Sequence, residues 1–189
     1  MTDKFDSELS DELGARVLED GEPLVLSDEV RALLRRSAEQ VALSPGDADE
    51  ALRSVPTATT LLQEISRRFT EGSKRLFEAS NKASDLRDAG DLDGACRQME
   101  DVLAVEVVPL YSQRAADSLH SLTRLKSVAA SGQIDPTLRD RSQLPILLHR
   151  VRQGHQLELN EAMRAFLRRS SADVGMSEAE TEEALALLR

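Results

Sequence analysis

The chain has 189 residues, a length typical of one domain or of one domain and a fragment. Only 3% of the residues are aromatic and none is tryptophan, so the core must be built from aliphatic side chains. The net charge of −10 argues against general binding to nucleic acid or anionic lipid. A single cysteine excludes a disulfide framework, and no apolar run approaches the roughly 18 residues of a membrane span. Met1–Asp20 also lacks the apolar core of a secretory signal, which predicts a cytoplasmic protein.

The first third of the chain predicts three short helices. Residues 1–60 hold 14 acidic and six basic residues, and therefore most of the net negative charge. A helix is expected over 7–19, closed by Asp20 and Gly21, after a frayed start at 1–6. Ser27 and Ser44 precede the next two helices as N-caps, and Pro45 suits the first helical position.

The strongest periodicity lies in the middle of the chain. Spacings of three and four residues relate a heptad seam of Leu62, Ile65, Phe69, Gly72, Leu76, Ala79, Ala83 and Leu86. Gly90 should end this helix and Asp91 should cap a second long helix running to about residue 126, kinked at Pro109. The short turn predicts an antiparallel helical hairpin over 55–126, in which the small seam residues let a partner helix approach closely.

Self-comparison reveals an internal repeat. Residues 21–53 align without a gap to 154–186, at an offset of 133, with 14 identities in 33 positions. The most similar block is RALLRRS against RAFLRRS, and Ser27 and Asn160 occupy equivalent N-cap positions. The division that follows is a full unit over 1–128 (head 7–54, hairpin 55–126), a linker over 129–143, and a truncated second head over 144–189. A head of this size cannot bury enough surface alone, so we expect it to dock on the hairpin or on another chain.

Three stretches carry a family resemblance: ARVLEDGEPL (15–24), LSDEVRALLRRSAEQVALSPGDADEALRS (26–54) and LRDAGDLDGACRQMEDVLAVEVVPLY (86–111). The first unit, roughly 10–122, resembles the DUSAM domain, a domain of unknown function found in myxobacteria. Residues 144–189 resemble the front of a second unit that lacks its hairpin. The resemblance implies a lineage and a domain boundary, and it implies no activity.

Most chemistry-bearing residues have a simpler structural interpretation. The run Asp91-Leu92-Asp93-Gly94 with Glu100 fits part of a calcium-binding EF-hand loop, but Ala89 stands at its first position and cannot ligate calcium. A capped hairpin turn is the favoured interpretation. Cys96 has no histidine near it in sequence and is expected to be a small packing residue. The three histidines, His120, His149 and His155, show no metal-ligand spacing, so no catalytic, cofactor or metal residue is predicted.

The candidate partner-binding residues are two arginine pairs at equivalent places in the two heads, Arg35 with Arg36 and Arg168 with Arg169. They could contact an acidic partner surface. The favoured alternative is intramolecular ion pairing with acids such as Glu39 or Asp173.

These observations predict an all-α protein, a compact helical bundle of one long hairpin and two small heads. The expected function is a non-enzymatic protein–protein interaction or regulatory adaptor, including an inhibitor that sequesters another protein. No cofactor, nucleic acid or membrane partner is expected. A homodimer stays open, because the heptad seam could serve a second chain. The alternative is a small-molecule-binding or enzymatic domain with a pocket between heads and hairpin.

Overall fold

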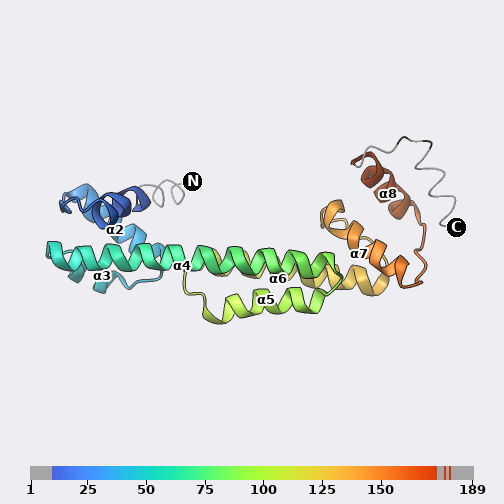
Figure 1. The fold of residues 1–189 in the computed structure, drawn as a ribbon, viewed down its shortest axis with the longest axis horizontal. Helices are drawn as coiled ribbons and strands as arrows, with labels where there is room; N and C mark the ends of the chain where they lie inside the picture. Colours follow the sequence, from blue (N-terminus) through green and yellow to red (C-terminus); the bar gives the residue numbers. More distant parts are fainter. Residues whose placement is uncertain (1–9, 174–176, 178, 180–189) are drawn as a thin grey trace. The chain divides into compact units, whose positions relative to one another are not determined.

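The computed structural model describes residues 10–173, 177 and 179 (Figure 1). This part of the chain is all-α, which confirms the predicted fold class, and it contains no strand. None of its helices combines the length and the apolar character needed to cross a membrane. Contacts divide the chain into two units, each described by itself below: unit 1 is Met1–Glu78 with Val102–Ala115, and unit 2 is Ala79–Asp101 with Ala116–Arg189.

The short helices of unit 1 follow their local sequence, and the predicted start of the first helix at residue 7 lies outside the described residues. Residues 10–19 are helical, and their last turn widens into the π-helix η1 (Ala15–Glu19). The hydroxyl of Ser27 accepts a hydrogen bond from the backbone N–H of Val30 at the start of α2 (Asp28–Gln40). Ser44 caps α3 (Pro45–Ala51) in the same way. The predicted N-caps are therefore confirmed.

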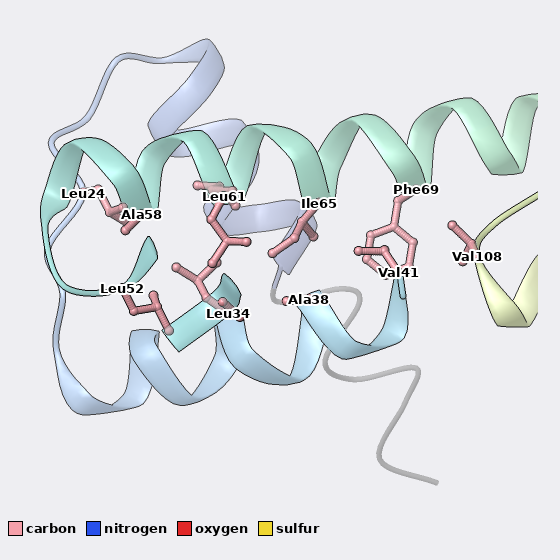
Figure 2. Close-up of a cluster of buried hydrophobic side chains, with 12 residues drawn as sticks. Leu24, Leu34, Ala38, Val41, Leu52, Ala58, Leu61, Ile65, Phe69 and Val108 are labelled. Atoms are coloured by element: carbon pink, nitrogen blue, oxygen red, sulfur yellow. The ribbon is translucent and has the colours of Figure 1, made fainter. Parts of the chain in front are cut away.

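An aliphatic core joins these helices to the first part of the long helix α4 (Val55–Asp88). Figure 2 shows Leu34, Ala38 and Val41 facing Ile65 and Phe69 across this core. Six members of the predicted seam, Leu62, Ile65, Phe69, Gly72, Leu76 and Ala83, are buried within the one chain. The small residue at 72 acts as predicted, since a Cβ there would lie 2.6 Å from Cδ2 of Tyr111.

The predicted second long helix is wrong, because it is two helices. α5 (Leu92–Val105) ends before Glu106, and α6 (Pro109–Ser131) begins at Pro109 itself. A proline disfavours helical geometry in the residue before it and suits the first turn of a new helix. The Glu106 carboxylate accepts a hydrogen bond from the N–H of Val108 at 2.8 Å, which stabilises the break.

Within unit 2, α6 runs back along α5. Asp93 forms an ion pair with Lys126, and Cys96 lies beside Thr123. The two helices are therefore antiparallel. The turn before α5 is as predicted. Gly90 has a φ of 87°, in the left-handed region that glycine adopts without strain.

The predicted linker over 129–143 is shorter in the structure. α6 continues to Ser131, and α7 (Asp140–Arg152) already begins at Asp140. Between them, Gly132 ends α6 at a φ of 71°. The predicted division into repeat units at this linker rests on the internal sequence repeat, and it stays a prediction.

The C-terminal helices of unit 2 pack on the end of α6. Val128 of α6 lies in one buried cluster with Leu147 of α7 and with Met163 and Phe166 of α8 (Glu161–Asp173). α8 has the 13 residues of α2, at the predicted offset, and the Asn160 side chain accepts from the N–H of Met163 as Ser27 does from Val30. The second short helix expected in this head, aligned with α3, falls on 178–184 and so lies almost wholly outside the described residues.

Candidate functional site

The four arginines predicted to bind a partner lie on the exposed sides of α2 and α8. Arg35 forms an ion pair with Asp49 at 2.6 Å, and Arg169 forms one with Asp140 at 2.7 Å. The carboxylates paired with Arg35 and Arg169 are therefore Asp49 and Asp140. Arg36 and Arg168 also interact within the protein. These arginines have intramolecular partners, and their role in partner binding stays a prediction.

The stretch with partial resemblance to a calcium loop is a capped turn. The Asp91 carboxylate accepts from the backbone N–H of Gly94 at 2.7 Å, as an N-cap residue does. Asp93 pairs with Lys126, whose hydrogen bond and charge lower the pKa of the carboxyl. In the described residues no group of three metal-binding side chains comes together.

Cys96 is buried on α5, and burial raises the pKa of its thiol. A thiol with a raised pKa is a poor nucleophile, in agreement with the predicted packing role. His149 lies beside Gly90, where an added Cβ would approach its ring within 2.8 Å, and its Nε2 is 2.8 Å from the amide nitrogen of Gln153. His149 therefore packs against the turn at Gly90 and contacts Gln153 in the next turn of the chain.

A pocket of about 450 Å³ lies within unit 2. The end of α4, α5, the middle of α6 and residues 137–142 form its walls. Its size falls within the usual range of small-molecule sites. The lining consists of Ser80, Ala83, Ser84, Arg87, Met99, Asp117, Ser118, Ser121, Leu122, Leu125, Thr137, Leu138, Arg139 and Ser142.

The pocket separates apolar from polar groups. Four of its lining side chains are buried and apolar: Ala83, Met99, Leu122 and Leu125. Six of the others carry hydroxyl groups, and two are arginines. Arg87 lies beside Asp88, with an N–H to carboxylate distance of 2.8 Å. Such a lining can bind a molecule with an apolar body and a polar head.

Hydrogen bonds fix the segment that carries one wall. The buried amide of Gln143 accepts from the N–H of Asp135 at 2.7 Å and donates to the carbonyls of Asp135 and Leu138. Arg124 makes two hydrogen bonds of 2.7 Å to the carboxylate of Asp135. The N–H and hydroxyl of Thr137 also donate to that carboxylate and, with Arg124, lower its pKa. The wall is therefore positioned before any ligand arrives.

Sequence reasoning missed this pocket and considered one between the heads and the hairpin instead. The true lining comes from four separated segments, and Arg139 fell within the predicted linker. One signal was present. Ser80 with Ser84 and Ser118 with Ser121 place hydroxyl groups three or four residues apart, on single faces of two helices.

Comparison with known proteins gives one match. A family model described as a protein of unknown function (DUF2379) matches residues 6–122, which is more than half of the chain and nearly the stretch that carried the resemblance noted above. No curated protein and no solved structure matches. The chain therefore belongs to the DUF2379 family, whose function is unknown.

Proposed function

We propose that this chain is a non-enzymatic interaction module of the cytoplasm, a regulatory adaptor or a partner that sequesters another protein. The observation that carries the proposal is Phe77, whose exposed fraction is 67%. Phe69 and Phe166 are buried at 8% and 0%, in a chain with four phenylalanines. Aromatic side chains are enriched in protein interfaces and in their energetic centres, where a partner covers them.

Unit 1 exposes further apolar side chains. Val105, Val107 and Leu110 are each about half exposed or more, and all three lie within four residues of Glu106 along the chain. Arg75, two residues before Phe77, forms an ion pair with Glu106. α4 and the turn between α5 and α6 thus each expose apolar side chains of the kind that an interface covers.

The chemistry of the partner follows from charge. Unit 1 contains the acidic first third of the chain, with 14 acidic and six basic residues in 1–60. We therefore expect a partner with a basic surface around an apolar pocket that receives Phe77. Opposite charges would speed the encounter, and added salt would slow it.

We also infer that residues 1–128 are a DUSAM domain and that residues 144–189 are a truncated second copy of it. The equal lengths of α2 and α8, their offset and their equivalent N-caps support this inference. Substitutions of Arg35 and Arg36 in the first head can therefore be compared directly with substitutions of Arg168 and Arg169 in the second.

Site-specific photo-crosslinking tests the proposal. A photoreactive phenylalanine analogue is placed at position 77 in the full chain and, as a matched control, at Val25, which is 70% exposed in the same unit. In native lysate we expect one adduct of defined mass from position 77 and none from position 25. The Phe77→Ser variant should lose that partner, while Val25→Ser should keep it.

Equal labelling from both positions, or none from position 77, would exclude this surface. An adduct of twice the chain's own mass would identify a second copy of the chain and replace the adaptor by a homodimer. A concentration series by light scattering separates these outcomes, because only the homodimer changes mass with concentration.

A second function, small-molecule binding, is favoured by the pocket of unit 2. Its lining includes none of Phe77, Val105, Val107 and Leu110, so either function can hold without the other.

A further inference from the structure

The pocket of unit 2 differs in charge from the protein that contains it. Two guanidinium groups, Arg87 and Arg139, and one carboxylate, Asp117, line it, whereas the chain as a whole has a net charge of −10. A guanidinium group attracts anions locally even in an acidic protein. The lining therefore offers anions a binding group that the net charge of the chain does not predict.

The two arginines differ in what they can offer to a ligand. Arg87 already pairs with Asp88. Arg139 is exposed and, within the described part of the chain, has no ion-pair partner. It also lies directly before α7, next to the hydrogen-bonded segment held by Gln143. The backbone at Arg139 is thus held in place, and its guanidinium can bind a planar carboxylate or a phosphate with two hydrogen bonds.

Hydroxyl groups extend the polar part of the lining. Ser80 and Ser84 come from α4, Ser118 and Ser121 from α6, and Thr137 and Ser142 from the segment around Arg139. In an α-helix such hydroxyls often donate to a backbone carbonyl, as Ser121 does to Asp117 at 3.0 Å. They can rotate to donate to an oxyanion instead.

The apolar part of the lining sets the other end of the ligand. Ala83, Met99, Leu122 and Leu125 are all less than a tenth exposed and offer no polar side-chain group. These side chains form an apolar floor that offers no hydrogen bond to an inorganic ion. An organic anion would place its apolar body against this floor and gain dispersion contacts with it.

We propose that the pocket of unit 2 binds a small organic anion. Its carboxylate or phosphate head is bound by Arg139 with help from Arg87 and the surrounding hydroxyls, and its apolar body packs on Met99, Leu122 and Leu125. The proposal is independent of the interaction surface in unit 1, because the two share no residue.

The test uses the full chain and three probes that each carry eight alkyl carbons: nonanoate, octyl phosphate and uncharged 1-octanol. Binding is followed by titration calorimetry and by the methyl resonance of Met99, which reports on the pocket itself. We expect at least one of the anions to shift that resonance and to bind about tenfold more tightly than 1-octanol. Whichever anion binds more tightly identifies the head group, and equal affinity indicates a general oxyanion site.

Two variants make the result specific. Arg139→Gln should weaken binding of the anion about tenfold and leave the affinity for 1-octanol unchanged. Arg152→Gln, an exposed arginine of α7 outside the lining, should change neither. Circular dichroism checks that both variants fold. The proposal is overturned if 1-octanol binds as tightly as the anions, if neither anion shifts Met99, or if the two variants behave alike.

Discussion

Arg75 and Glu106, 31 residues apart in the chain, form an ion pair in which only one side chain remains in water. Nη1 of Arg75 lies 2.5 Å from Oε2 of Glu106, and the carboxylate side chain is 1% exposed against 35% for the arginine. The other carboxylate oxygen accepts from the N–H of Val108. The pair therefore joins α4 to the turn at which α5 gives way to α6.

Removing the arginine should cost more than neutralising the carboxylate. Arg75→Ala leaves a buried charge with one backbone hydrogen bond, and we expect a loss of about 2–4 kcal/mol in the free energy of unfolding. Glu106→Gln frees a guanidinium that water can reach, and about 1–2 kcal/mol is expected. Urea unfolding measures both. Lys74→Ala, which removes a 4.0 Å exposed pair with Glu78, should cost less than about 0.5 kcal/mol. Equal losses at positions 75 and 74 would show that burial of Glu106 has no energetic weight.

Alanine should be harmful at Gly72 and favourable at Gly46. An added Cβ at position 72 would meet the ring of Tyr111 at 2.6 Å and the Glu106 carboxylate at 3.0 Å, whereas position 46 in α3 has nothing within 4 Å. We expect Gly72→Ala to destabilise by about 1–3 kcal/mol through overpacking. Gly46→Ala should stabilise by about 0.5 kcal/mol through helix propensity. Thermal unfolding of the two variants compares them, and a stabilised Gly72→Ala would contradict the close approach.

Glycine should be favourable at Ala42. This residue has a φ of 59°, where an L side chain is strained, and its side chain is exposed, so little packing is lost. The residue aligned with it in the repeat is Gly175. We expect Ala42→Gly to stabilise by about 0.5–1 kcal/mol, measured by urea unfolding. The same substitution at Ala104, exposed within α5, should instead cost about 1 kcal/mol, so losses at both positions would argue against strain at Ala42.

Glu64 should make part of the stability dependent on pH. Hydrogen bonds from Arg67 and then Arg68 lower the pKa of its carboxyl from 4.5 to about 2. Because the pKa is lowered in the folded state, the stabilisation is complete above pH 4.5 and is lost as the pH falls towards 2. Solvent screening limits its size to about 1 kcal/mol.

The measurement is the difference in unfolding free energy between the wild type and Glu64→Gln. It should be about 1 kcal/mol at pH 7 and shrink steadily below pH 4.5. Glu78→Gln serves as the control, since its pair with Lys74 spans 4.0 Å at the surface, and its difference should be small throughout. A Glu64→Gln difference that grew on acidification would contradict a lowered pKa of Glu64 in the folded state.

Gln143 should hold the segment that forms one wall of the pocket. In Gln143→Leu the N–H of Asp135 and the carbonyls of Asp135 and Leu138 lose their partner. About 1–3 kcal/mol of stability should be lost, together with protection of the Asp135 amide in hydrogen exchange. Gln133→Leu, at an exposed position of the same segment, should leave that amide protected. Loss of protection in both variants would show that the segment is not held by Gln143.

Features set by neighbouring residues could be predicted from the sequence, and features set by distant ones could not. Ser27 and Ser44 cap their own helices, and Gly90 ends its own helix, so local chemistry was sufficient. Pro109 is compatible with a kink or with a new helix. The outcome depends on Glu106, whose partner Arg75 lies on another helix.

The repeat shows the same limit. α2 and α8 share their length and cap, yet α2 buries Leu34 while α8 buries Phe166, which aligns with Leu33. The buried face follows from what each helix packs against. The pocket was invisible for the same reason, since Ser84, Met99, Ser121 and Arg139 meet only in three dimensions.

The break at 106–108 also bears on how fast the chain can fold. Only three residues separate α4 from α5, and three separate α5 from α6. Each reversal closes a short loop, so the contacts that it forms cost little chain entropy. Helical proteins dominated by such sequence-local contacts reach the native state within microseconds to milliseconds. The turn at Val107 and Val108 thus divides one long helix, which would need a distant partner, into two shorter helices that can pack on each other early in folding.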